Sequence, residues 1–586
     1  MTVTPPQAGD ATIPPARLGA DRPDPGSARA VSQGFLARAA LVTVGLSLAG
    51  ALLGLGRDQV LARLFGAGSE TDAFLVAWTV PEFAATLLIE DGLAFALVPA
   101  FSAAVARRRT HGDTGDPVRA LVRSTLPRLS LAFAVASALF VFGAPYLVEA
   151  LAPGLHNPGF AVDCTRLTGT CVLTFGLAGY CSAALRGHRR FVAPAAIYVA
   201  YNTAIITAMF ALGARWGVRA AAVGVAVGGA LMVVTQLPSL LRQLHRRQTA
   251  PATDRADPTD KTDAADTAVT ADPADPADTT VTADPADTAD AAAPAKDRRT
   301  MNLTLIVTVL LFALCRQSQV LVERFLASTL PAGAISHLNY AQKVAQMPMV
   351  LSLMLCTVTF PVVAQALAEG DTERARDRVE CDLRVVSCVV LLGTAAIVAC
   401  APQLVHLLFQ RGAFTARDTA ATAAVMRVYA LGLLGQALVG ALVRSYFSAG
   451  RPTWYPMAAM TAGIVATSWL GAWAVGSFGV LGIAAANAAG ITLTALILLY
   501  GMGARSVPIR TRRVLAEMSK PLRAAVVACV VGGFCASRID SPALGLAAGG
   551  TAVTVVFLLL ARVLGVQDLA PALRTVTRRL PYARIR

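Results

Sequence analysis

One stretch of the sequence decides the fold: residues 54–99 read GLGRDQVLARLFGAGSETDAFLVAWTVPEFAATLLIEDGLAFALVP. It places Arg57 and Asp58 at the end of an apolar helix, turns at Gly66, and enters a second apolar run with prolines at 81 and 99. A charged side chain at the centre of a membrane helix costs about 2.5–3.5 kcal/mol on insertion scales, so it usually faces a polar cavity. The stretch therefore predicts a membrane protein built around such a cavity.

Composition supports a polytopic membrane protein. The chain has 586 residues, of which 55% are hydrophobic, and a mean hydropathy of +0.58. The net charge of +15 lies in short loops between apolar runs, which is the positive-inside pattern and argues against nucleic-acid binding. No P-loop, nucleophile motif or CxxC pair occurs, so we expect no enzyme activity, no cofactor, no metal and no structural disulfide.

A membrane span needs roughly 20 apolar residues. Hydropathy predicts an all-α protein with about fourteen spans, two of which are long and interrupted by proline, as in helices that line transporter cavities. The spans are 35–56, 72–105, 126–150, 164–185, 192–213, 218–241, 302–327, 336–366, 385–409, 420–448, 454–476, 479–502, 520–537 and 542–564.

Basic clusters fall in alternate loops, so these loops and both termini are predicted to be cytoplasmic. The chain divides at an Ala/Asp/Pro/Thr-rich acidic segment that cannot bury a core. RDQVL at 57–61 and RQSQVL at 316–321 are similar, which indicates a parallel repeat with the cavity between two six-span lobes. The predicted units are a disordered tail 1–33, an N-lobe 34–247, a disordered linker 248–300, a C-lobe 301–505, a helix pair 506–565 and a basic tail 566–586.

Arg57 follows Gly50 and Gly54 on nearly the same helix face, so small residues admit a neighbouring helix beside the guanidinium. One hypothesis is an anion clamp, because the arginine fork binds phosphate oxygens. The alternatives are an ion pair with Asp58 or Asp72, or a side chain that reaches the membrane interface.

Two further polar stripes lie in the seventh and eighth spans. They are Arg316, Gln319 and Glu323, and Asn339, Lys343 and Gln346. A polar seam between the lobes is one interpretation, and an internal ion pair of Glu323 with Lys343 or Arg324 is the other. Glu90 and Asp91 follow the second-span proline and are expected to face water.

Three blocks of sequence resemble the MurJ/MviN family of bacterial lipid II flippases, within the multidrug/oligosaccharidyl-lipid/polysaccharide exporter superfamily. They are GRDQVLARLFGAGSETDAFLVAWTVP at 56–81, FLASTLPAGAISHLNYAQKVAQMP at 325–348 and FQRGAFTARDTAATAAVMRVYALGL at 409–433. The resemblance implies fourteen helices, with a last pair that forms a groove for the polyprenyl tail. It implies export of lipid II by alternating access, with cavity arginines on the pyrophosphate.

By position, the resemblance assigns functional roles to Arg57 and Asp72. It also places Lys343 where the family usually has arginine, and Glu323 near an acidic position linked to cation binding. Several expected residues differ. The family's arginines are replaced by Ala51, Ala85 and Thr86, and its polar residues in the eleventh span by Thr467 and Ser468. Arg316 is a candidate replacement for one lost charge.

The sequence therefore predicts a monomeric lipid II flippase of the bacterial cytoplasmic membrane, with the cell-wall synthesis machinery as a candidate partner. Two alternatives stay open. One is export of another polyprenyl-linked glycan or amphiphile by the same superfamily. The other is a non-transporting scaffold of a cell-wall complex.

Overall fold

The computed structural model consists almost entirely of helices, and its described residues contain no strand, which confirms the all-α fold class. The described residues are 25–90, 92–110, 116–245, 295–349, 352, 363, 366, 369–448 and 453–566. Asp91 and residues 246–294, which include most of the predicted linker 248–300, lie outside them. Helices begin at Pro25, inside the predicted tail, and at Ala295, inside the predicted linker.

The described residues of the first half form ten α-helices and one π-helical segment. They are α1 (Pro25–Phe65), α2 (Ser69–Ala77), α3 (Thr79–Ala84), the π-helix η1 (Ala85–Glu90), α4 (Gly92–Thr110), α5 (Pro117–Phe142), α6 (Ala144–Leu151), α7 (Pro158–Gly169), α8 (Cys171–Gly187), α9 (Val192–Trp216) and α10 (Arg219–His245).

The described residues of the second half form eight helices. They are α11 (Ala295–Ala327), α12 (Ala334–Ala345), α14 (Thr372–Phe409), α15 (Ala416–Ala430), α16 (Leu433–Ser448), α17 (Tyr455–Arg505), α18 (Thr511–Ser537) and α19 (Pro542–Val563). Across the described chain, eight helices are long and apolar enough to span a membrane, or nine if α15 and α16 form one bent span. The number of fourteen spans stays a prediction.

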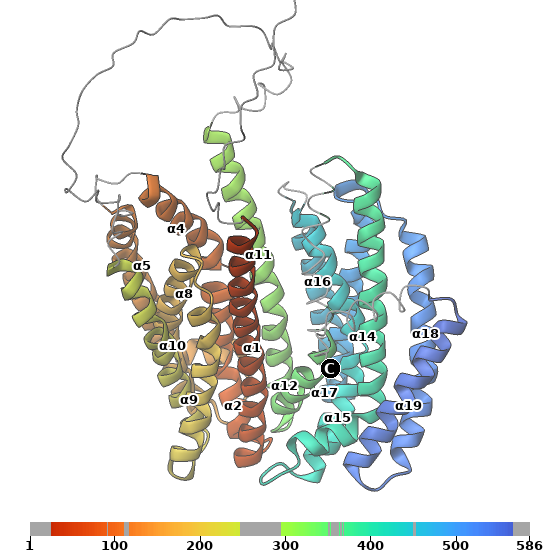
Figure 1. Ribbon diagram of the computed structural model, residues 1–586. Coiled ribbons are helices and arrows are strands. Elements are labelled where there is room, and N and C mark those ends of the chain that lie inside the picture. Colours follow the sequence, from red (N-terminus) through yellow and green to blue (C-terminus); the bar gives the residue numbers. More distant parts are fainter. Residues whose placement is uncertain are drawn as a thin grey trace, which may run out of the picture.

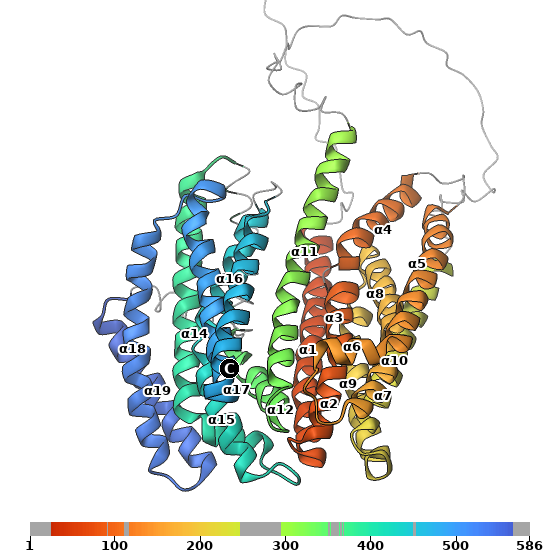
Figure 2. The same ribbon diagram turned by 180° about the vertical axis from the view of Figure 1, so that it is seen from behind.

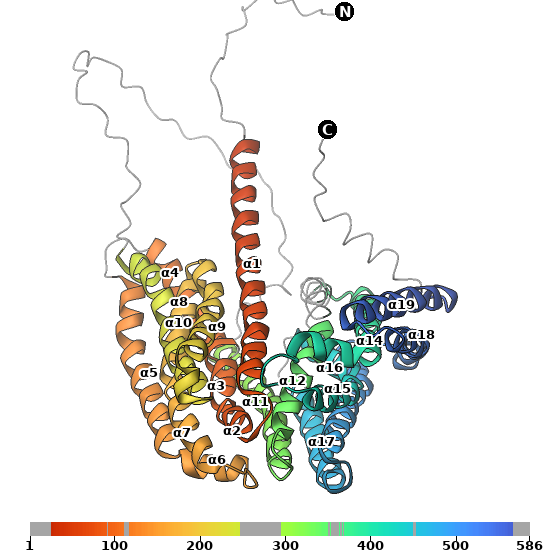
Figure 3. The same cartoon turned by 90° about the horizontal axis from the view of Figure 1, so that it is seen from below.

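The helices form two lobes. Figures 1 and 2 show α1 to α10 on one side and α12 to α19 on the other, with α11 between them. Helix α11 packs against α17 in the second lobe and also contacts α3, η1 and α6 of the first. Figure 3 shows α18 and α19 at the outer edge of the second lobe, where both pack against α14.

The second predicted span, 72–105, is interrupted near Pro81. It covers α2, α3, η1 and most of α4, and the first three elements meet at Trp78 and Ala85. Proline has no N–H, so the carbonyl four residues earlier, at Ala77, loses its helical donor. The Thr168 hydroxyl of α7 donates to that carbonyl at 3.1 Å. The break is therefore stabilised by a neighbouring helix, as broken membrane helices require.

Helix α14 has a similar repair. Pro402 lies inside the helix, and Cys400 beside it has non-helical backbone angles. The carbonyl that Pro402 leaves without a donor is that of Val398. Arg427 of α15 donates its Nε to this oxygen at 3.1 Å. Each lobe thus contains a proline kink whose unpaired carbonyl accepts a hydrogen bond from another helix.

The two lobes meet at the end of the molecule opposite to the start of α11 (Figure 1). The backbone N–H of Ala413 donates to the Arg63 carbonyl at 2.8 Å, and that of Gly154 donates to the Ser328 hydroxyl at 3.3 Å. Gly66 has a φ of +67°, and a Cβ atom there would lie 2.7 Å from the Ala413 carbonyl oxygen. Only glycine satisfies both conditions, so this turn allows the lobes to touch through their backbones.

Candidate functional site

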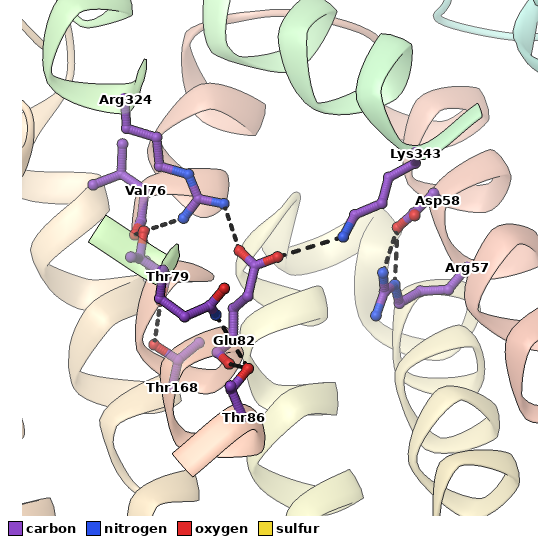
Figure 4. A network of polar contacts seen from close by, with 11 residues as sticks. Arg57, Asp58, Val76, Thr79, Glu82, Thr86, Thr168, Arg324 and Lys343 are labelled. Carbon is purple, nitrogen blue, oxygen red and sulfur yellow. Dashed lines mark hydrogen bonds and ion pairs between the residues drawn. The ribbon is translucent and has the colours of Figure 1, made fainter. Parts of the chain in front are cut away.

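Glu82 lies at the centre of an ion-pair network that joins the lobes (Figure 4). Its side chain is on α3 in the first lobe, one residue after Pro81. Its two carboxylate oxygens accept from Arg324 Nη2 of α11 at 3.1 Å and from Lys343 Nζ of α12 at 3.4 Å. Arg324 also donates to the Thr79 hydroxyl. One carboxylate from the first lobe therefore holds two cations from the second.

The three side chains of the network differ in solvent exposure. The Arg324 side chain is 7% exposed, whereas those of Glu82 and Lys343 are 24% and 33% exposed. Arg324 is thus the anchored partner, and Lys343 is the more accessible one. Two cations against one carboxylate leave a positive excess, which favours an anion at this position.

The Arg57 guanidinium is held by an ion pair, a hydrogen bond and a cation–π contact. Its Nε and Nη2 both donate to Asp58 Oδ1, at 2.9 and 2.7 Å, and its Nη1 donates to Asn202 Oδ1 at 3.3 Å. The guanidinium lies 4.2 Å from the centre of the Trp78 ring. Of the predicted ion-pair partners, the structure shows Asp58, which is 5% exposed. The pair is locally neutral and fixed in orientation.

The glycines before Arg57 admit α9, as their spacing predicted. A Cβ atom at Gly50 would lie 3.0 Å from the Cβ of Tyr198. The Asn202 amide donates to the Gly50 carbonyl at 3.1 Å while its oxygen accepts from Arg57. Close packing of α1 and α9 therefore places the asparagine that orients the arginine.

Asp72 binds the start of α12 and does not pair with Arg57. Its oxygens accept from the backbone N–H groups of Gly333 and Ser336, at 2.7 and 2.8 Å, and from the Ser336 hydroxyl at 2.5 Å. A carboxylate at a helix N-terminus is favoured by the free N–H groups and by the helix dipole. Asp72 is 4% exposed, so this inter-lobe contact is buried.

The other predicted residues lie apart from Glu82. Arg316 of α11 has an exposed side chain, and Glu90 is exposed at the end of η1, where it accepts from the Tyr198 hydroxyl at 2.8 Å. Glu323 is 5% exposed and accepts from the Asn487 amide of α17, inside the second lobe. The predicted ion pair between Glu323 and Lys343 is replaced by these separate contacts.

The three hydroxyl residues that replace family residues form hydrogen bonds of their own. Thr86 of η1 accepts from the Gln317 amide of α11 at 3.1 Å, and it donates to the Glu82 carbonyl at 3.2 Å. Thr467 and Ser468 donate to carbonyls one turn earlier in their own helix. Among the described residues, no group of three or more His, Cys, Asp or Glu side chains is placed to hold a metal ion.

The sequence pattern does not indicate Glu82 as a site residue, and it suggests Arg324 only as a partner for Glu323. The available signal was a lone carboxylate directly after a proline within an apolar run, which is expensive in lipid without a partner. The two cations that bind it lie 242 and 261 residues further along the chain. That pairing depends on the tertiary fold.

A family model described as "Lipid II flippase MurJ" matches residues 61–544. The chain is 27% identical to the lipid II flippase MurJ of Burkholderia cenocepacia over 420 residues, which are 70% of this chain and 73% of the relative. It is 23% identical to the probable lipid II flippase MurJ of Vibrio cholerae over 531 residues, which are 88% of this chain and 91% of the relative.

Solved structures show the same fold. An inward closed conformation of lipid II flippase MurJ superposes with a TM-score of 0.68 at 18% identity, over 89% of this chain and 98% of that one. An inward-facing multidrug resistance MATE transporter of the MOP superfamily superposes with a TM-score of 0.57 at 14% identity, over 82% and 99%.

Proposed function

This chain belongs to the lipid II flippase MurJ family of membrane transporters, and we propose that it moves lipid II across the bacterial cytoplasmic membrane for cell-wall synthesis. The observation that carries the proposal is the Glu82 network with its positive excess between two lobes. The cargo head group carries a pyrophosphate, which sets two requirements. The site must offer cations at membrane depth, and these cations must have a counter-ion when no cargo is bound.

Glu82 meets the second requirement by acting as an internal counter-ion. In the empty protein it neutralises one charge of the Arg324–Lys343 pair. An arriving pyrophosphate offers more oxygens than a carboxylate, and the Arg324 guanidinium can bind two of them at once. Exchange of Glu82 for the pyrophosphate then releases the link between the lobes when cargo is bound.

Arg324 also compensates for missing family arginines. Ala85 and Thr86 replace two of them in the first lobe, and Gln317 from α11 contacts Thr86 instead. We infer that α11 supplies from the second lobe the cationic contact that the first lobe lacks. Asp58 fixes the orientation of the Arg57 guanidinium, which then presents N–H groups at the edge of the same site.

We place the termini, the linker and the basic loops in the cytoplasm, because the positive-inside rule favours that orientation. The Asp72–α12 contact and the Arg63–Ala413 hydrogen bond then close the periplasmic side. Opening toward the periplasm requires both to break while the lobes come together at the other end. The halves of the repeat meet within one chain, so we propose that a monomer suffices.

The test measures lipid II exposed on the outer face of cells that are depleted of their own flippase and express this chain. We expect exposure to be restored by the wild type and lost with Arg324→Gln. The control is Arg219→Gln, which removes an ion pair with Asp163 whose side chains are 48% and 44% exposed. A well-inserted Arg324→Gln chain with full activity would contradict the proposed site.

Two outcomes separate the alternatives. A well-expressed and inserted wild-type chain that restores no exposure would assign the activity to another polyprenyl-linked glycan. Full support of growth by a chain lacking the charges of both Arg57 and Lys343 would favour a scaffold, because a transporter of anions needs them. Co-purification with cell-wall synthases would test the predicted partners.

A further inference from the structure

A polar cavity lies on the outer side of the second lobe, away from the Glu82 network. It has a volume of about 210 Å³ and lies between α14, α18 and the end of α19. The polar side chains in its lining are Arg384 from α14, and Arg513, Glu517 and Lys520 from α18. Gly565, just after α19, completes the rim. Three cations and one carboxylate therefore surround the cavity.

The carboxylate is already bound within the cavity lining. Both oxygens of Glu517 accept from Lys520 Nζ, at 3.0 and 2.8 Å. The two side chains are 30% and 28% exposed, so the pair is accessible from the cavity. The cations still outnumber the carboxylate, and an anion entering the cavity meets a net positive field.

The cavity lies at the level where three spans cross the membrane surface. Hydropathy predicts that two spans begin at residues 385 and 520 and that another ends at residue 564. Arg384, Lys520 and Gly565 each stand within one residue of these boundaries. Lipid phosphates lie at this depth, and basic pockets between helices at the cytoplasmic surface suit anionic head groups.

The cavity walls are held in place by hydrogen bonds. Glu380 of α14 accepts from the backbone N–H of Arg510 at 2.8 Å, which ties the start of α18 to α14. Gly565 ends α19 with a φ of +73°, and the N–H of Val566 donates to the Ala561 carbonyl at 2.9 Å. The site is thus preformed, which lowers the entropic cost of binding.

We propose that this cavity binds the phosphate of an anionic phospholipid from the cytoplasmic leaflet. The Arg384 guanidinium, whose Nε donates to the Glu380 carbonyl at 3.3 Å, and the Arg513 guanidinium present positive charge to phosphate oxygens, and Lys520 adds a third cation. Met518 and Pro521 supply the apolar part of the lining, next to the acyl chains. The lipid bound here is a resident of the membrane, distinct from the transported cargo.

The test uses the purified full-length chain in phosphatidylcholine nanodiscs and measures binding of phosphatidylglycerol by native mass spectrometry. A Lys or Arg near an anionic surface contributes about 1 kcal/mol, or roughly a fivefold gain in affinity. We expect Arg384→Gln/Arg513→Gln to weaken binding about 25-fold. Arg523→Gln on α18 is the control, because that exposed side chain lies outside the cavity lining and bonds to the Ser519 carbonyl.

Glu517→Gln provides an independent measurement, because it adds no new bulk and raises the net charge. We expect it to tighten phosphatidylglycerol binding severalfold, and unchanged binding would overturn the proposal even if the double variant fails to fold. Equal binding of phosphatidylcholine would also overturn it. Binding of undecaprenyl pyrophosphate that is lost in the Arg384→Gln/Arg513→Gln variant, without any phosphatidylglycerol binding, would assign the site to the cargo and refute a resident lipid.

Discussion

Replacement of Glu82 by glutamine tests the internal counter-ion directly. The Arg324 pair is largely buried, and a hydrogen bond to a charged group there contributes about 1.5–3 kcal/mol. The Lys343 pair is a third exposed and 3.4 Å long, so it contributes about 0.2–1 kcal/mol. A pyrophosphate that displaces Glu82 must overcome roughly 2–4 kcal/mol of these contacts.

Glutamine keeps a neutral acceptor of about half that strength. The Glu82→Gln variant should therefore bind a pyrophosphate lipid more tightly by about 1–2 kcal/mol, which is roughly fivefold to thirtyfold. Its release should slow by a similar factor, so lipid II export should fall although binding improves. A variant that only damaged the fold would lose both.

The assay is equilibrium binding of undecaprenyl pyrophosphate to the purified full-length chain, with thermal unfolding measured in parallel. Glu70→Gln is the matched control, because Glu70 is an exposed carboxylate on neighbouring α2. Unchanged or weaker binding by Glu82→Gln, with an unchanged unfolding midpoint, would refute the counter-ion role.

Three further changes have defined outcomes. Thr168→Val should cost about 1–3 kcal/mol of stability in thermal unfolding, because it leaves the Ala77 carbonyl unpaired, and Pro81→Ala should rescue it by restoring the backbone donor. Asp72→Asn should weaken closure at the α12 N-terminus by about 0.5–2 kcal/mol and shift spin-label distances across that contact toward the open form. Lys343→Arg should tighten binding of undecaprenyl pyrophosphate severalfold, because the fork binds two oxygens at once.

A control variant or a contradicting outcome tests each change. Thr170→Val removes a hydroxyl that bonds only within its own turn, to the Leu167 carbonyl, and should leave stability nearly unchanged. Additive effects of Thr168→Val and Pro81→Ala would disprove the carbonyl repair. Spin-label distances in Asp72→Asn that match the wild type would show that the backbone contacts alone close the lobes. Weaker binding by Lys343→Arg would mean that lysine is selected for its compact charge.

The interruption of the second span near Pro81 could be predicted from the sequence, because a proline within an apolar run removes a backbone donor. The sequence also pointed to Pro99, but that proline lies inside continuous α4. The close approach of α1 and α9 could be predicted from Gly50 and Gly54, since small residues at helical spacing leave room for a neighbour. The partner of Arg57 stayed open between Asp58 and Asp72, because both carboxylates are near it in sequence. Only the fold decides between them.

The inter-lobe ion pairs could not be predicted. Helical spacing places Glu323 and Lys343 on polar stripes, but it does not tell which stripe faces which lobe. In the structure the two adjacent side chains have partners in different lobes: Glu323 accepts from Asn487, and Arg324 donates to Glu82. By contrast, hydropathy correctly separates two spans at residue 479, because Gly479 within α17 has non-helical backbone angles, with a φ of +54°, and divides it into two helical segments.

In the contact between Asp72 and α12, the second lobe supplies mostly backbone donors and the first lobe supplies a side-chain acceptor. Two of the three donors are peptide N–H groups at Gly333 and Ser336, which nearly every residue type supplies. The acceptor is a single side chain. Position 333 is nonetheless restricted to glycine, because its φ is +97° and a Cβ atom there would lie 2.9 Å from the Ala67 carbonyl oxygen. The peptide donor at position 336 survives most substitutions, whereas almost any mutation at position 72 removes the acceptor. Mutations that weaken closure at this contact should therefore concentrate at Asp72 and Gly333.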